Sequence, residues 1–169
     1  KYLDLARYVQ PMIMSARGCP FNCPFCSLGA YWKGKISFRS PKMMLKELQL
    51  LESLGVRSVF FADPCFMLNR KRLLEFIGAV KNKVKMDFKC YGRLDLVDEE
   101  MCRLLTDSNF KIIFYGLESG SENVLKQIKG GFSVGEGLKI IKISKKYFPQ
   151  VEVSLMWGFP FETLDDLRQ

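Results

Sequence analysis

The sequence has no histidine among its 169 residues, so no imidazole is available to complete a metal site. It also shows no secretory leader and no apolar run of membrane-spanning length, so we expect no membrane partner. Three of the six cysteines, Cys65, Cys90 and Cys102, are scattered without a pairing pattern. Because disulfide frameworks belong to oxidising compartments, we expect a protein of the reducing cytoplasm.

Acidic residues are fewer than basic ones. The sequence has 18 Asp+Glu and 26 Lys+Arg, which give a net charge of +8. The one local group of basic residues lies on one side of a predicted helix and comprises Lys139, Lys142, Lys145 and Lys146. Leu138 and Ile141 form the other side of this helix, so a solvated helix face explains the lysines. No recognised binding motif accompanies the charge, and we therefore expect no nucleic-acid partner.

From Met12 onward, short apolar runs alternate with amphipathic segments, which is typical of β/α units around a parallel sheet. The predicted strands span residues 12–16, 56–61, 86–91, 112–115 and 151–157. The predicted helices follow residues that favour helix starts, namely Ser40-Pro41, Asn69, Asp98, Ser121, Ser133 and Thr163. The helix after Asn69 is expected to bury Leu73, Leu74, Ile77 and Val80.

Five such units, connected right-handedly, predict the α/β class and a partial (β/α) barrel with its helices outside. We assign residues 1–169 to one domain, and the end of the chain one turn into a predicted helix suggests a fragment of a longer protein. The loops that follow the five strands then share one rim. All residues of chemical interest fall on that rim, where α/β folds place their sites.

The stretch "GCPFNCPFCS" at residues 18–27 brings Cys19, Cys23 and Cys26 into one short loop. A zinc site needs four ligands, and here it would have to borrow Cys65 or Cys90 from neighbouring strand ends. A redox pair of Cys23 and Cys26 would leave the third thiol without a role. A 4Fe-4S cluster held at three corners uses all three thiolates and leaves one iron open to another ligand. The competing readings are a catalytic cluster site and a zinc- or cluster-binding module without catalysis.

The cysteine spacing, with aromatic Phe25 before the last cysteine, resembles the signature of the radical S-adenosylmethionine (radical SAM) enzymes. The stretches that continue the resemblance are "SARGCPFNCPFCS", "RSP", "FADPCFMLNRKR", "GRLDLVDEE", "YGLESGSENVLKQIKGG" and "GFPFET". Together they resemble the branch that often carries an N-terminal cobalamin-binding domain.

The resemblance implies a 4Fe-4S cluster on Cys19, Cys23 and Cys26, whose open iron binds S-adenosylmethionine. One electron would then cleave the cofactor into methionine and a 5′-deoxyadenosyl radical that abstracts hydrogen from a small-molecule substrate, so an electron donor is also implied. Cobalamin-dependent methyl transfer, through a domain that precedes this chain, is a further implication. The complete fold in this family has a sixth strand, so we expect either that oligomer contacts cover the edge beside residues 151–157 or that the protein is marginally soluble.

The resemblance also implies cofactor contacts at the strand ends. Phe25 would lie beside the adenine, and the Ala62 backbone and the Asp63 carboxylate would meet the methionine amino group. Arg93 would meet the methionine carboxylate. Ribose hydroxyls would be bound by Glu118 and Ser119, and the backbone at Gly158 and Pro160 would lie against the adenine.

Overall fold

The fold was analysed in a computed structural model that describes residues 10–169. The first nine residues of the domain predicted over residues 1–169 lie outside the described residues. Five parallel strands form one sheet in the order β1-β4-β5-β6-β7, and β2 and β3 form a separate antiparallel pair. The α/β class and the five parallel strands predicted from the sequence are therefore confirmed.

The main-sheet strands are β1 (Met12–Ile13), β4 (Ser58–Phe61), β5 (Asp87–Gly92), β6 (Phe110–Glu118) and β7 (Gln150–Leu155). The small pair is β2 (Ala16–Arg17) and β3 (Ser37–Phe38). The helices are α1 (Ser27–Trp32), α2 (Pro41–Ser53), α3 (Arg70–Val80), the 3-10 helix η2 (Leu94–Leu96), α4 (Glu99–Thr106), α5 (Glu122–Ile128), α6 (Val134–Tyr147) and α7 (Leu164–Leu167). Within residues 10–169 no helix is both long and apolar enough to cross a bilayer.

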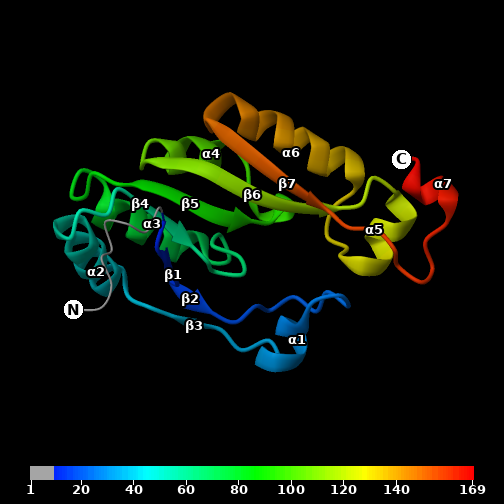
Figure 1. Ribbon diagram of the computed structural model, residues 1–169, viewed down its shortest axis with the longest axis horizontal. Coiled ribbons are helices and arrows are strands. Elements are labelled where there is room, and N and C mark those ends of the chain that lie inside the picture. Colours follow the sequence, from blue (N-terminus) through cyan, green and yellow to red (C-terminus); the bar gives the residue numbers. More distant parts are fainter. Residues whose placement is uncertain (1–9) are drawn as a thin grey trace.

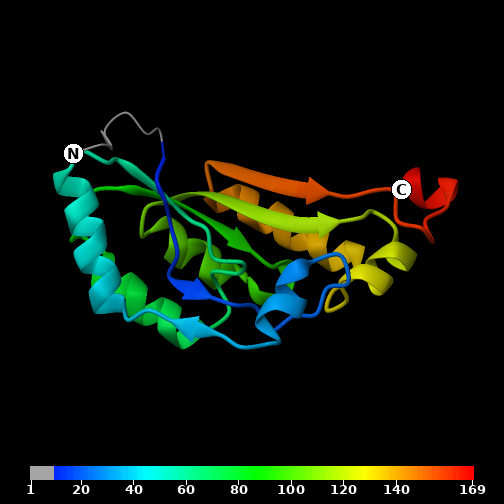
Figure 2. The same cartoon turned by 60° about the horizontal axis from the view of Figure 1, so that its bottom comes forward.

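Helices and the N-terminal loop occupy opposite sides of the sheet. Figure 1 shows α4 and α6 lying along β6 and β7, whereas α1 lies across the sheet from them. In Figure 2 α1 comes forward and α6 lies behind β6 and β7. The connection from β2 to α1 thus lies on the side of the sheet that α4 and α6 leave uncovered.

The predicted helix starts are confirmed by side-chain caps. The Asn69 side chain accepts a hydrogen bond from the backbone N–H of Arg72 at 2.9 Å, which satisfies one of the free donors at the start of α3. Asp98 caps α4 in the same way. At the start of α6, Ser133 and Glu136 form the reciprocal capping box that their spacing predicts.

An aromatic cluster forms the core between the sheet and its helices. The Phe61 ring is fully buried and contacts four other rings, those of Phe66, Phe76, Phe88 and Phe110, with centroids 4.7 to 5.9 Å apart. Burying one such side chain contributes roughly 2 kcal/mol. The next residue back, Phe60, belongs to the opposite face of the sheet because side chains alternate along a strand. It packs there against Tyr91 and Phe114.

The first strand is shorter than the predicted span of residues 12–16. Only Met12 and Ile13 pair with β4, and the chain then turns into β2, which pairs with β3 instead. The physical reason is Asp63, whose carboxylate accepts hydrogen bonds from the backbone N–H groups of Ser15 and Ala16 at 2.6 and 2.9 Å. These donors are consequently unavailable to a longer parallel ladder.

Two further predictions about the late strands need correction. Strand β6 spans nine residues rather than the predicted four, because β5 and β7 pair with it on its two sides. Strand β7 ends at Leu155, so Trp157 lies outside it and is 77% exposed.

Two leucines expected in the core are exposed. Leu74 is 42% exposed, and Phe76 takes its place on the buried side of α3. On α6, Leu138 is 45% exposed, because the helix seats Gly137 against the sheet instead. A β-carbon at Gly137 would lie 2.9 Å from Cδ1 of Leu117, so a larger residue here would have to displace the Leu117 side chain.

Candidate functional site

The predicted cysteine loop connects β2 to α1 and is closed by a glycine at its base. Gly18 has a φ of +93°, and a β-carbon there would overlap the carbonyl oxygen of Lys35. Only glycine tolerates both conditions, so Gly18 lets the start of the loop pack against the chain that returns from α1 to β3. At the far end, the Cys26 N–H donates to the Cys23 carbonyl at 2.9 Å, which forms a tight turn just before α1.

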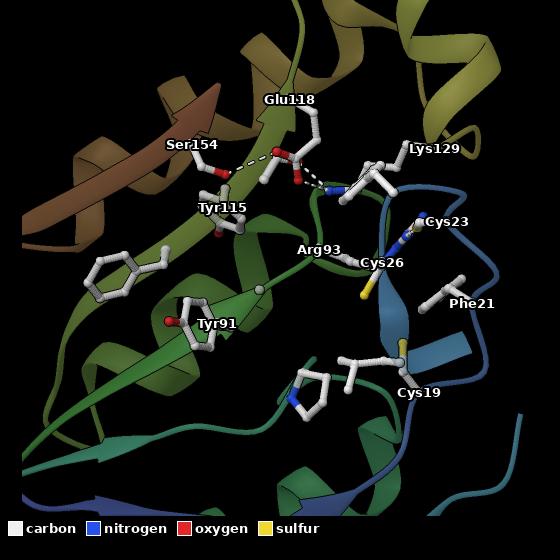
Figure 3. A pocket seen from close by; sticks show the side chains of 16 residues that line it. Cys19, Phe21, Cys23, Cys26, Tyr91, Arg93, Tyr115, Glu118, Lys129 and Ser154 are labelled. Carbon is white, nitrogen blue, oxygen red and sulfur yellow. Dashed lines mark hydrogen bonds and ion pairs between the residues drawn. The ribbon is translucent and has the colours of Figure 1, made fainter. Parts of the chain in front are cut away.

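All three loop cysteines are free thiols and half-buried, and they line one cavity of about 330 Å³. The remaining walls are the loop residues Phe21 and Phe25, Leu28 of α1, and residues in or beside the strands and α5, namely Pro64, Tyr91, Gly92, Arg93, Phe114, Tyr115, Gly116, Glu118, Lys129 and Ser154. Figure 3 shows the cysteine loop on one side of this cavity and the strand ends on the other. The ends of the strands and the cysteines therefore line one site, as expected if the loops after the strands share one rim of the sheet.

The pKa of the Cys19 thiol is raised, first by burial and also by the nearby thiols of Cys23 and Cys26, while the Phe21 backbone N–H acts in the opposite direction. Cys19 thus lies close enough to both other thiols for them to act on it. A bound cation would relieve the repulsion between their thiolates.

The chemistry of the donor set fits an iron-sulfur cluster. Within residues 10–169 no three Cys, His, Asp or Glu side chains converge on a point where a single metal ion could sit. A cluster is held through separate iron atoms, so its thiolates need not meet at one point. Three free thiols that face one cavity from one loop satisfy this requirement, whereas they lack the fourth ligand of a structural zinc site.

A buried ion pair occupies the opposite wall of the cavity. Glu118 Oε1 lies 2.9 Å from Nζ of Lys129, and the Ser154 hydroxyl donates to Glu118 Oε2 at 3.1 Å. Lys129 also donates to the Gly116 carbonyl at 2.6 Å. Sequence reasoning identified Glu118 but missed Lys129, whose one local signal is its position at the end of α5, just before Gly130 and Gly131.

Backbone geometry at the end of β6 is adapted to this pair. Glu118 has a φ of +72°, an uncommon conformation for a residue with a side chain, and the pairing of β6 with β7 shifts register between Gly116 and Glu118. A β-carbon at Gly116 would overlap Oε1 of Glu118. The strand is therefore distorted so that the carboxylate folds back over Gly116 into the cavity.

Arg93 also lies in the cavity wall, at the end of β5, and is 7% exposed. Its guanidinium forms a two-pronged ion pair with Asp95 and donates toward the sulfur of Cys23 at 3.7 Å. The side chain predicted to meet a cofactor carboxylate thus has its donors directed at Asp95 and Cys23.

Asp63, predicted to meet the methionine amino group, does not line the cysteine cavity. Its carboxylate is fully buried and accepts hydrogen bonds from the N–H and hydroxyl of Ser15 and from the N–H of Ala16. Burial raises the pKa of Asp63, although these hydrogen bonds and the charge of Arg72 oppose the shift. Asp63 therefore anchors the chain that leads into the cysteine loop. The neighbouring Ala62 is half-buried, and its N–H donates to the Ile13 carbonyl at 2.8 Å.

The other candidates at the ends of β6 and β7 are not brought into the cysteine cavity. The Ser119 hydroxyl accepts from the N–H of Ser121 at 3.1 Å, and Ser119 lines a second cavity of about 340 Å³. Gly158, with a φ of +90°, and Pro160 line neither cavity. The Glu162 carboxylate accepts hydrogen bonds from the N–H groups of Gly158 and Phe159 and so braces this turn.

One contact links this turn to the cysteine loop. The rings of Phe159 and Phe25 lie with centroids 6.4 Å apart at an interplanar angle of 60°, within the range of favourable aromatic pairs. The segment after β7 therefore lies beside the aromatic residue of the cysteine motif.

The three scattered cysteines belong to the core. Cys65, Cys90 and Cys102 are each at most 1% exposed, and none lines the cysteine cavity. Burial raises the pKa of Cys65 to about 12. Such thiols are poor ligands because the binding species is the thiolate.

The chain is similar to known proteins in family, sequence and fold. The family model described as "Radical SAM superfamily" matches residues 13–169. An uncharacterized methyltransferase of Pyrococcus horikoshii is 28% identical over 163 residues, which cover 93% of this chain and 35% of the relative. The chain thus spans about a third of the length of this curated relative.

Two solved structures share the fold. The radical S-adenosylmethionine methyltransferase TsrM from Kitasatospora setae, with cobalamin and a [4Fe-4S] cluster bound, superposes with a TM-score of 0.84 at 16% identity, covering 94% of this chain and 33% of that one. The cobalamin-dependent S-adenosylmethionine radical enzyme OxsB, with aqua-cobalamin bound, gives 0.79 at 19% identity, covering 93% and 25%. At these identities the likeness establishes the fold alone.

Proposed function

The chain belongs to the radical SAM superfamily, and on that premise we propose that it is a catalytic core that uses a 4Fe-4S cluster to cleave S-adenosylmethionine reductively. The observation that carries the proposal is the placement of three free thiols from one loop, Cys19, Cys23 and Cys26, on the wall of a cavity that the carboxyl ends of β5, β6 and β7 close. Enzymes with parallel sheets place their chemistry at this end of the strands.

The cluster, when bound, supplies the electron that breaks a carbon-sulfur bond of S-adenosylmethionine, which generates the 5′-deoxyadenosyl radical. The residues of the chain hold the cluster and orient S-adenosylmethionine. Cys19, Cys23 and Cys26 provide the three thiolates, and the half-buried cavity wall limits access of water to them.

Glu118 is our candidate for the ribose hydroxyls. Its carboxylate is held at two points, by Lys129 and by Ser154, and each of its oxygens keeps a lone pair for a further donor. A carboxylate that is fixed before the ligand arrives loses little conformational freedom on binding. Lys129 is therefore proposed as the residue that positions Glu118.

Phe25 is our candidate for the adenine, because its ring lines the cavity and a neutral aromatic face suits a stacked base. The contact between Phe25 and Phe159 supports the proposal that the backbone at Gly158 and Pro160 approaches the same base. For the methionine amino group the Ala62 backbone remains the candidate. We do not carry Asp63 or Ser119 into the cofactor site, because their side chains are directed elsewhere.

For the whole protein we propose cobalamin-dependent methyl transfer to a small-molecule substrate, with a cobalamin-binding domain outside this chain. The support is the methyltransferase relative in Pyrococcus horikoshii and the fold shared with two cobalamin-dependent enzymes. An external electron donor is required to reduce the cluster. We also propose that a further segment or a second copy covers β7, because β7 lies at the edge of the sheet and Leu155 is 57% exposed.

The experiment uses the full-length protein, reconstituted without oxygen and reduced with dithionite in the presence of S-adenosylmethionine. We expect 5′-deoxyadenosine and methionine, and S-adenosylhomocysteine in addition if methyl transfer takes place. Glu118→Gln should raise the KM for S-adenosylmethionine, whereas Glu100→Gln, on the exposed side of α4, should not. A reduced, iron-loaded enzyme that consumes no S-adenosylmethionine would contradict the proposal.

A further inference from the structure

Arg93 connects the sheet to the cysteine loop through three different contacts. Its Nε and Nη2 atoms each lie 2.8 Å from one oxygen of Asp95 in η2. This bidentate ion pair fixes the plane of the guanidinium, because Asp95 binds both Nε and Nη2. The side chains are 8% and 16% exposed, so water screens the pair only weakly.

The two parts of the guanidinium that Asp95 leaves free both contact the cysteine loop. Its central carbon lies 3.7 Å from the centroid of the Phe21 ring, a cation-π contact to a residue between two of the cluster cysteines. The remaining amino group, Nη1, donates toward the sulfur of Cys23 at 3.7 Å. Figure 3 shows Arg93 reaching from the strand ends toward this side of the cavity.

We infer that Arg93 is a positioning residue that holds the cysteine loop against the sheet and raises the reduction potential of the cluster bound there. The inference rests on the proposed function and adds to it a role for a residue that sequence reasoning assigned to the cofactor carboxylate. Reduction adds one electron from the external donor to the cluster, and at Arg93 no bond forms or breaks and no proton moves.

The direction of the effect follows from electrostatics. The reduced cluster with its thiolates is more negative than the oxidised one, so a nearby cation and an N–H donor to sulfur stabilise the reduced form more. Asp95 sets the size of this effect, because its negative charge offsets part of the guanidinium charge. Loss of Arg93 should thus make the cluster harder to reduce, and loss of the Asp95 charge should make it easier.

Two roles of Arg93, binding the cofactor carboxylate and acting on the cysteine loop, lead to different experimental results. If Arg93 served only the carboxylate of S-adenosylmethionine, its substitution would weaken cofactor binding and leave the cofactor-free cluster unchanged. If it acts on Cys23 and Phe21, the potential changes even without the cofactor.

The test is an EPR-monitored redox titration of the full-length, anaerobically reconstituted protein without S-adenosylmethionine. For Arg93→Gln we expect, at a fixed potential, an about tenfold lower ratio of reduced to oxidised cluster, which for one electron equals about 59 mV. Arg93→Lys keeps the charge without the planar fork and should shift less than half as far. Asp95→Asn should shift in the opposite direction.

Arg70→Gln is the matched control, because it removes the same charge from an exposed arginine paired with Asp98 and Glu100, outside the cavity. A fully iron-loaded Arg93→Gln protein with the potential of the control would overturn the inference. If Arg93→Gln takes up too little iron to titrate, unchanged potentials in both Arg93→Lys and Asp95→Asn would overturn it equally. Absence of iron in the unsubstituted protein would instead contradict the proposed function.

Discussion

Glu118 and Lys129 form an ion pair of 2.9 Å inside the cavity that the cysteine loop closes, with side chains 8% and 6% exposed. The two residues come from different elements, the end of β6 and the turn that follows α5. Burial of both charges is tolerated because each has a second polar partner, Ser154 for the carboxylate and the Gly116 carbonyl for the ammonium.

Removing the cation from this pair should destabilise the protein strongly. Lys129→Met leaves the Glu118 carboxylate buried without its counter-charge, and we expect the free energy of unfolding to fall by about 3 kcal/mol. Urea denaturation of the reconstituted protein measures the loss. The double variant Glu118→Gln, Lys129→Met should recover at least about 1 kcal/mol relative to the sum of the single changes. Additive losses would show that the pair is not coupled.

Gly116→Ala should weaken S-adenosylmethionine binding without unfolding the sheet. The new methyl group would overlap Oε1 of Glu118 and lie 2.6 Å from Nζ of Lys129, so the carboxylate must turn away. Loss of one charge-assisted hydrogen bond predicts about tenfold weaker binding by calorimetry. Gly78→Ala in α3 is the control, because nothing lies within 4 Å of its added methyl group. Equal affinities in the two variants would refute the role given to Glu118.

An aromatic ring at position 25 should be required for cofactor affinity. Phe25→Ala removes the stacking face from the cavity wall and should cost about 1–3 kcal/mol of binding free energy, whereas Phe25→Trp should retain most of it. Tyr31→Ala provides the control, since Tyr31 lies on α1, is 77% exposed and does not line the cavity. If the alanine variants at 25 and 31 bind alike, the adenine lies elsewhere.

Asp166 should make the attachment of α7 sensitive to acid. Hydrogen bonds from the Ser121 hydroxyl and from the N–H and hydroxyl of Thr163 lower the pKa of Asp166 from 3.8 to about 2. Because the folded-state pKa is the lower one, the stabilisation is complete well above pH 3.8 and is lost as the pH falls toward 2. Hydrogen exchange of α7 should therefore be faster in Asp166→Asn than in the parent at pH 6, and the difference should shrink toward pH 2. A difference independent of pH would contradict this assignment.

Sequence reasoning succeeded where the physical cause is local. The Ser133–Glu136 capping box, the Asn69 cap and the start of α2 at Pro41 depend on residues within one helical turn, and each is observed as predicted. The cysteine loop was also predictable, because its three thiols lie within eight residues of one another, whereas the short helix α1 that follows it was not predicted.

The failures have long-range causes. Asp63 binds Ser15 and Ala16, which lie 48 and 47 residues away in sequence, and this contact shortens β1 and directs the carboxylate toward the backbone that follows β1. Lys129 reaches the cavity from the turn after α5, where it binds the Gly116 carbonyl and Glu118, which lie 13 and 11 residues away in sequence. No periodicity or spacing in the sequence encodes either contact.

Iron and acid-labile sulfide analysis of the full-length protein, reconstituted and purified without oxygen, tests the central claim most directly. The account predicts about four iron and four sulfide atoms per chain, brown colour, and an EPR signal after reduction by dithionite. The Cys23→Ala variant should lose most of this iron, whereas Cys102→Ala, a buried thiol outside the cavity, should retain it. A colourless protein that binds one zinc per chain, or iron that persists when Cys19, Cys23 and Cys26 are all replaced, would contradict the account.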